Sequence, residues 1–453
     1  MQLLMLVVKL SNKLFNESKF KNFFKKYFYG LNELKQRIIF LIIALLFFRV
    51  GSFISIPGIN VGVITNLLKN QQNTFLDMLN IFSGGSLNHA SIFALGVMPY
   101  ISASIIMQLL IILLPVLKKK KKDGELDNYI ISNYVRYITF FLSLFQSFLI
   151  AISLPNMYII RFFIFNPGIF FYITTILSLV CGSMFLMWLS EQITEFGIGN
   201  GISIIIFIGI ISNLPSVLIN ILDQFLCGNI NILHFILSCF FIFLIIFLVT
   251  YFECAQRRIF VSYIGCKQVC SFYIHQNTYL PFKINMSGVV PSIFTSTIII
   301  FLSFFFSWLS NIICFKYFTI VSMYLKSSCF LYLFLFILGV LFFCFFYTSL
   351  ILSPNEISIN LKNSGVFITG IRPGKQTTEY INKIVTNLTF IGVFYIILIC
   401  LISEYIRKFL DLPFYFNGTS ILIIVVVIIE FINQIKNLIL SFKYNFLFKK
   451  YKF

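Results

Sequence analysis

The chain contains ten apolar stretches that are each long enough to cross a lipid bilayer as a helix. A spanning helix needs roughly 20 mainly apolar residues. Stretches of that length lie near residues 37–56, 91–114, 135–154, 168–189, 202–222, 232–252, 288–313, 328–352, 384–403 and 419–439. With 59% hydrophobic and 11% charged residues, the chain lacks the polar groups that a water-soluble surface needs. The sequence therefore predicts an all-α polytopic membrane protein with ten transmembrane helices.

The distribution of Lys and Arg predicts how these helices are oriented. Cytoplasmic loops of membrane proteins are enriched in basic residues, and an even number of helices places both termini on one side. The termini and alternate loops carry 27 of the 34 basic residues: eight up to Arg37, six in 118–136, four in 257–283, four in 362–383 and five from Lys436 onward. We therefore expect a cytoplasmic N-terminal segment, 1–36, and a cytoplasmic tail, 441–453. The same asymmetry explains the net charge of +19 without a charged substrate.

The segment before the second apolar stretch indicates a helix that is too short to cross a membrane. Residues 74–82 are mainly apolar, and Gly84 and Gly85 follow them. A short helical piece at membrane depth is tolerated only inside protein or beside a water-filled cavity. The span that follows carries small and polar residues that lipid would not favour, including Ser102, Ser104 and Gln108. Together these features predict a movable piece of a pore.

The residues that usually support redox or metal chemistry are poorly placed for it here. Cys254, Cys266 and Cys270 share one loop but lack the paired spacing of metal sites, and the three histidines lie on unrelated segments. Cysteines within apolar helices behave as small hydrophobic residues. They include Cys181, Cys239, Cys344 and Cys400. We expect no metal, no cofactor and no enzymatic activity.

Three connections carry further signals. In residues 190–207, three glycines lie between two predicted spans. This pattern fits either a plain helical hairpin or a turn that fixes the next helix so that Ile202 and Ile206 lie on one of its faces. Two cytoplasmic loops, 253–286 and 353–383, are longer than a connection needs. Their basic tips, with Arg257 and Arg258 in one and Arg372 in the other, suit either carboxylate or phosphate recognition or a solvated turn.

Several segments, in this order, resemble the SecY family, the pore subunits of the bacterial Sec translocon. They are FSGGSLNHASIFALGVMPYISASIIMQLL, GIGNGISIIIF, QRRI, LPFKINMSGVVPSIF, NLKNSGVFITGIRPGKQTTEYI and PFYFNGTSILIIVVV, within residues 31–444. The resemblance implies two inverted five-helix halves, 37–222 and 223–440, that open toward lipid between helices two and seven. It implies that the short helix at 74–85 is a re-entrant plug that closes the resting channel.

The resemblance also implies the roles of particular residues. A ring of aliphatic side chains would narrow the pore: Val97, Ile101, Ile202, Ile206, Ile293 and Ile423. The plug would comprise Thr74, Phe75, Leu76, Asp77, Met78, Leu79, Asn80, Ile81, Phe82, Ser83, Gly84 and Gly85. Arg257, Arg258 and Arg372 would dock the SecA motor or the translating ribosome. The stretch 263–273 departs from the family pattern, because it has one basic residue where the family usually has several.

The function implied is a protein-conducting channel in the bacterial plasma (inner) membrane. It would pass unfolded preproteins across the membrane and release transmembrane segments sideways into lipid. Its partners would be SecE, SecG, SecA, the ribosome, signal peptides and membrane lipid.

Two other classes of protein stay open at this stage. A secondary transporter also uses inverted repeats and interrupted helices, but it needs polar ligands at mid-membrane. The ionisable residues within the predicted spans, chiefly Arg49 and Glu430, lie toward helix ends. A non-conducting scaffold that only binds partners is the second alternative.

Overall fold

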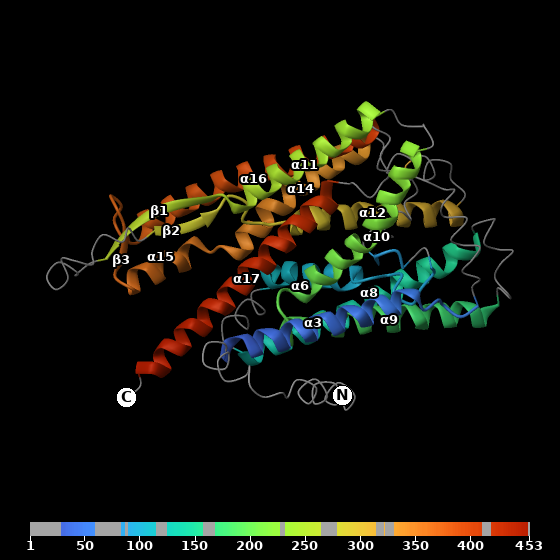
Figure 1. The fold of residues 1–453 in the computed structure, drawn as a ribbon, viewed down its shortest axis with the longest axis horizontal. Coiled ribbons are helices and arrows are strands. Elements are labelled where there is room, and N and C mark those ends of the chain that lie inside the picture. The colour runs from blue at the N-terminus through green and yellow to red at the C-terminus, as the bar shows by residue number, and fades with distance from the viewer. Residues whose placement is uncertain are drawn as a thin grey trace.

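The computed structural model describes residues 29–58, 83–86, 89–114, 125–156, 168–226, 232–263, 279–313, 321, 330–409 and 418–451. Within these residues, helices occupy all ten predicted stretches (Figure 1). They are α3 (Tyr29–Phe53), α6 (Met98–Leu113), α8 (Glu125–Asn156), α9 (Ile169–Phe196), α10 (Gly201–Leu226), α11 (Ile232–Cys254), α12 (Val290–Ile313), α14 (Phe330–Ile351), α16 (Lys375–Phe409) and α17 (Gly418–Tyr451).

Six of the described helices are long and apolar enough to cross a membrane by length and composition alone: α3, α8, α9, α14, α16 and α17. The remaining four, α6, α10, α11 and α12, contain shorter apolar segments of 10–17 residues. The chain is therefore a multi-pass helical membrane protein. Hydroxyl groups within the helices mostly donate to carbonyls three or four residues earlier, as Ser143 does to Phe140 at 2.8 Å, so they need no partner in lipid.

The second predicted span begins later than the hydropathy of 91–114 indicated. Its helix, α6, starts at Met98, and residues 89–97 form turns and a bridge between Ser55 and Ser91. Gly96 has a φ of +58°, which interrupts a helix, and Pro99 lies in the first turn, where a missing N–H costs nothing. Hydropathy detects neither the backbone angle of Gly96 nor the position of Pro99. The predicted start of this helix, at residue 91, was therefore seven residues too early.

The helices pack in two groups, with α17 between them (Figure 1). In one group, α8 contacts α6 and α9, and α9 contacts α3; in the other, α14 contacts α12 and α16. Helix α17 contacts both groups, through α3 and α10 on one side and α11 and α16 on the other. The predicted boundary between the halves at residues 222 and 223 falls inside α10, and that division stays a prediction.

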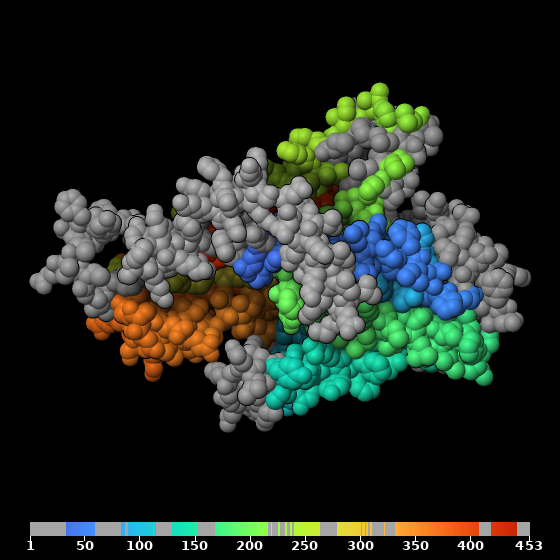
Figure 2. All heavy atoms as spheres, turned by 60° about the horizontal axis from the view of Figure 1, so that its bottom comes forward, coloured from blue at the N-terminus to red at the C-terminus, as the bar shows by residue number. Residues whose placement is uncertain are grey.

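The outer faces of the helices are apolar. On the face in Figure 2, the side chains of α8 and α9 lie next to one another. Phe141 on α8 is 69% exposed and Leu177 on α9 is 57% exposed. Large exposed apolar side chains over several helices suit contact with lipid rather than with water.

The two long loops predicted to be cytoplasmic are joined in one small sheet, which the sequence analysis did not predict. Strand β1 (Gln256–Tyr263) pairs antiparallel with β2 (Tyr279–Lys283) and, at its other end, with β3 (Val366–Ile368). A short helix, α15 (Pro354–Asn363), precedes β3. The sheet packs on α16 through a cluster that includes Ile259, Phe282, Ile368 and Ile381. The sheet is therefore anchored to the helices beneath it.

Candidate pore and gate

The six predicted ring residues come from four helices and all belong to the large apolar cluster that joins these helices; that they form a ring stays a prediction. Val97 and Ile101 lie at the start of α6, Ile202 and Ile206 at the start of α10, Ile293 at the start of α12 and Ile423 at the start of α17. Val97, Ile101, Ile206 and Ile423 are buried, whereas Ile202 and Ile293 are half-buried; all six belong to the same continuous cluster. The fold therefore brings together residues that are up to 326 positions apart in the chain.

The turn before α10 sets the direction of that helix. Gly199 has a φ of +96°, and the backbone of Gly201 lies directly against the carbonyl of Ser190. A side chain at either position would disturb this turn. Asn200 then accepts a hydrogen bond from the N–H of Ile202 through its Oδ1 at 3.2 Å. These contacts fix the start of α10, from which Ile202 and Ile206 project.

Most of the predicted plug lies outside the described residues, namely Thr74 through Phe82. Its last three residues, Ser83, Gly84 and Gly85, are described, and Ser83 and Gly84 are buried. Gly84 and Gly85 have φ angles of +72° and +82°, which favour glycine. Gly84 and Gly85 therefore form a turn that lies against α10, while the plug itself stays a prediction.

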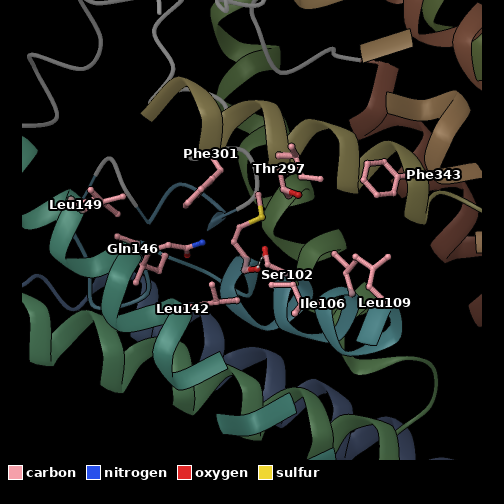
Figure 3. A pocket seen from close by; sticks show the side chains of 15 residues that line it. Ser102, Ile106, Leu109, Leu142, Gln146, Leu149, Thr297, Phe301 and Phe343 are labelled. Carbon is pink, nitrogen blue, oxygen red and sulfur yellow. Dashed lines mark hydrogen bonds between the residues drawn. The ribbon is translucent and has the colours of Figure 1, made fainter. Parts of the chain in front are cut away.

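A cavity of about 250 Å³ lies between α6, α8 and α12 (Figure 3). Ser102, Ile106 and Leu109 of α6 and Leu142, Gln146 and Leu149 of α8 face it, together with Thr297 and Phe301 of α12 and Phe343 of α14.

The lining of this cavity is apolar apart from a few groups. The hydroxyls of Ser102 and Thr297 donate to their own helices, at 3.0 and 2.9 Å. The Oε1 of Gln146 is buried and has no hydrogen-bond partner among the described residues. The cavity therefore suits an apolar segment, and it separates the two helices predicted to form the lips of a lateral gate.

The three predicted docking arginines are all exposed and belong to one structural unit. Arg257 and Arg258 lie on β1, and Arg372 lies in the turn after β3. The guanidinium of Arg258 stacks over the ring of Tyr279 on β2, 4.7 Å from its centre. Pairing of Tyr263 with Val366 joins the two loops. The run of β-branched and aromatic residues in QRRIFVSY was a strand signal that the sequence analysis missed.

A buried network at the root of this sheet was also missed. The side-chain N–H of Asn285 donates to Glu253 Oε1 at 2.6 Å and to the Gly288 carbonyl at 3.2 Å. The hydroxyl of Ser287 donates to Asn285 Oδ1 at 3.1 Å. Because Glu253 ends α11 and Gly288 precedes α12, the network ties these two helices together where the sheet emerges. One Glu directly after a long apolar run was the only signal in the sequence.

Among the residues that the structure describes, no group of three or more His, Cys, Asp or Glu side chains is arranged to hold a metal ion. Cys181, Cys254, Cys344 and Cys400 are free thiols.

The helical groups, the apolar cluster that joins them and the cavity between α6 and α12 fit a multi-pass membrane protein of the channel class. A family model described as SecY matches residues 91–432. The chain is 49% identical over 421 residues to protein translocase subunit SecY of Escherichia coli strain K12, covering 93% of this chain and 95% of that protein. It is 52% identical to the SecY subunit of Buchnera aphidicola subsp. Acyrthosiphon pisum, covering 93% and 96%. The chain belongs to the SecY family.

Solved structures agree with this fold. A structure of a protein-conducting channel aligns with a TM-score of 0.63, covering 90% of this chain and 93% of the other, at 15% identity. Canine Sec61 in a ribosome–channel complex aligns with a TM-score of 0.60 over the same shares, at 14% identity. At such low identity these likenesses concern the fold alone.

Proposed function

We propose that this chain is the central protein-conducting subunit of a bacterial Sec translocase. It passes unfolded secretory polypeptides across the inner membrane and releases transmembrane segments sideways into lipid. Its termini lie in the cytoplasm, and residues 37–222 and 223–440 act as two halves around the pore. Membership of the SecY family supports this role. The structural observation that supports it is that the six aliphatic residues assigned to the ring, from α6, α10, α12 and α17, all belong to one apolar cluster.

The ring explains how one pore can seal and still pass many sequences. Its β-branched side chains are stiff at χ1 and shed water, so a closed ring resists the passage of ions. They offer no hydrogen-bonding group that would hold a peptide passing through. A wider opening therefore admits chains of any sequence without binding them tightly.

The cavity between α6, α8 and α12 supports a lateral gate. Transfer of the apolar core of a signal peptide, 7 to 15 residues long, from water into such a site lowers the free energy. At the facing start of α12, the hydroxyls of Ser292, Thr295 and Ser296 donate to carbonyls of their own helix at 2.7 to 2.8 Å. Because these hydroxyls donate within α12, they contribute little to binding the neighbouring helix. Helices α6 and α12, the two sides of the proposed gate, therefore adhere weakly and separate reversibly.

The exposed arginines support docking of a motor or a ribosome at the cytoplasmic sheet. Guanidinium groups suit carboxylates on a protein such as SecA and phosphates on ribosomal RNA. Canine Sec61 is part of a ribosome–channel complex, which favours the same use of this surface here. SecE and SecG complete the membrane complex in this proposal.

A secondary transporter fits the site less well. Its substrate would need polar or charged ligands near mid-membrane. The six side chains assigned to the ring are aliphatic, and the buried carboxyl groups Glu253 and Glu404 lie near the C-terminal ends of α11 and α16.

The test is reconstitution of this chain with SecE and SecA in proteoliposomes. We expect ATP-dependent uptake of a secretory precursor into a protease-protected space. The Ile206→Asn variant should also take up a precursor with a defective signal, because a polar ring residue weakens the closed seal. Absence of uptake would contradict the proposal. Uptake that is the same for intact and defective signals, and the same with and without Ile206→Asn, would contradict it as well.

A further inference from the structure

The segment that follows the predicted plug is held by helix α10. The hydroxyl of Ser212 donates a hydrogen bond to the carbonyl oxygen of Gly84 at 3.1 Å and to that of Gly209 at 2.7 Å. Residues 84 and 212 are 128 positions apart, so this is a tertiary contact. One hydroxyl on α10 thus bridges the helix and the segment.

The two backbones approach one another as closely as glycine allows. A methyl group on Gly84 would come within 2.8 Å of the Gly209 Cα, and one on Gly85 would come within 2.7 Å of Asn213 Oδ1. Real side-chain carbons essentially never lie that close to other atoms, so a larger residue at position 84 would push the segment off the backbone of α10, and one at position 85 would displace the Asn213 side chain. Gly84 and Gly85 therefore meet two demands, a left-handed turn and a close fit.

The contact with α10 lies on the same stripe of that helix as the pore ring. Ile202, Ile206, Gly209 and Asn213 are spaced by four, three and four residues, which places them along one face of an α-helix. Ser212 is one residue before Asn213. The ring residues of α10 and the contact with Gly84 are therefore about one turn apart on one rigid element.

The segment after Gly85 is itself fixed along its described length. The Ser86 hydroxyl donates to the Phe93 carbonyl at 2.9 Å, and the Ser91 N–H donates to the Ser86 carbonyl at 2.9 Å. The N–H of Ile92 donates to the Ile54 carbonyl at 3.0 Å.

Two glycines on neighbouring helices make room for the same segment. The backbone of Gly182 on α9 lies against the Ile92 carbonyl, and Gly51 on α3 lies under the ring of Phe93. This tightly packed connection leads directly to Val97 and Ile101, the ring residues at the start of α6.

We propose that Gly209, Ser212 and Asn213 form a seat on α10 that positions residues 83–86 and, through the described residues 89–97, the ring residues Val97 and Ile101. One helix then sets both sides of the constriction: Ile202 and Ile206 directly, and the α6 residues through the seat. The seat residues are positioning residues, since they do not line the ring themselves. The inference rests on the proposed function of the ring.

The experiment uses the reconstituted complex with two variants of the seat residue Ser212 and one variant of Gly84. Ser212→Ala removes the bridging hydroxyl, and Ser212→Thr keeps it. Gly84→Ala adds a methyl group against Gly209. Two measurements are made at equal protein amounts: resting ion conductance in planar bilayers and uptake of a precursor with a defective signal.

Matched controls separate the seat from general damage. Gly365→Ala imposes similar backbone strain, at a φ of +67°, where no atom lies within 4 Å. Ser132→Ala removes a hydroxyl that donates to a carbonyl three residues earlier, at 2.7 Å. Neither residue belongs to the ring, the plug or the docking arginines.

We expect Ser212→Ala to raise conductance and uptake of the defective precursor about fivefold, the change that losing a hydrogen bond of about 1 kcal/mol produces in an equilibrium. Ser212→Thr should restore both, and Gly84→Ala should exceed Ser212→Ala. Damage to folding alone would lower uptake of every precursor, so a gain identifies the seat. If Gly84→Ala fails to accumulate, Ser212→Ala and Ser212→Thr still decide the matter.

The inference is wrong if Ser212→Ala matches the two controls in both measurements. The Ile206→Asn variant is run alongside to separate this failure from failure of the ring. A loosened Ile206→Asn channel with an unchanged Ser212→Ala channel would reject the seat and leave the ring. No change in either variant would reject the ring assignment as well.

Discussion

The buried bond between Asn285 and Glu253 makes a quantitative prediction about stability. Glu253 is 7% exposed and Asn285 is 3% exposed, and the bond between them is 2.6 Å long. Leaving one buried polar group without its partner costs about 1–3 kcal/mol. We expect Asn285→Leu to destabilise the protein by that amount, because it strands the Glu253 carboxyl group at the junction of α11 and α12.

The double variant gives the sharper result. Replacing both buried partners by apolar groups of similar shape can be nearly neutral. Glu253→Met combined with Asn285→Leu should therefore be more stable than the sum of the two single changes predicts, by about 1–3 kcal/mol of coupling. Ser287→Ala is the matched control, since it removes one hydroxyl bond to Asn285 Oδ1 and leaves the bond to Glu253 intact; about 0.5–1.5 kcal/mol is expected.

Equilibrium unfolding of the purified protein in mixed micelles, with increasing denaturing detergent, measures all four variants under one condition. Additive effects of Glu253→Met and Asn285→Leu would refute the reasoning, because they would mean that the two side chains do not depend on one another. A single Asn285→Leu change that costs no more than Ser287→Ala would refute it equally.

Three further outcomes follow from the described contacts. Arg372→Glu should reduce SecA-driven uptake severalfold without changing thermal stability, since the side chain is exposed; unchanged uptake would remove Arg372 from the docking surface. Ile298→Trp should partly fill the cavity between α6, α8 and α12 and weaken photo-crosslinking of a signal peptide to α6; equal crosslinking would place the signal peptide elsewhere. Arg136→Ala removes an ion pair in which the guanidinium donates two hydrogen bonds to Glu191, at 2.9 and 3.2 Å. It should lower the free energy of unfolding by at most about 1 kcal/mol, because the Arg136 side chain is 40% exposed. A loss above about 3 kcal/mol would contradict this.

The helices were predictable because lipid leaves the backbone few choices. A chain crossing hydrocarbon must satisfy its N–H and C=O groups internally, so a long apolar stretch such as 384–403 becomes helical whatever its neighbours are. The same rule does not locate helix ends. Tyr29 begins α3 eight residues before the predicted span, and α17 continues to Tyr451, through most of the predicted tail. Polar residues outside the membrane extend helices without any hydropathy signal.

Strand β1 carried a local signal, but the pairing of the sheet and the seat were not predictable, because they depend on contacts between distant residues. Strand β3 has three residues and pairs with a strand about 100 positions earlier, so neither periodicity nor length marks it. The sequence shows that Gly84 and Gly85 follow the short apolar segment, but the partner of Gly84, Ser212, is visible only once α10 is in place. The six ring residues came from resemblance, since nothing in the residues alone distinguishes Ile206 from Ile205.

The central claim, that a polypeptide passes through the ring, is tested most directly by crosslinking. A photo-crosslinking amino acid is placed at Ile206 or Ile423 in the ring, or at Phe247, which is 59% exposed on the outer face of α11. A secretory precursor is then stalled midway through translocation and the sample is illuminated. We predict strong crosslinks from positions 206 and 423 to the stalled chain and none from position 247. Crosslinks that are absent from the ring positions, or equal at all three, would contradict the account.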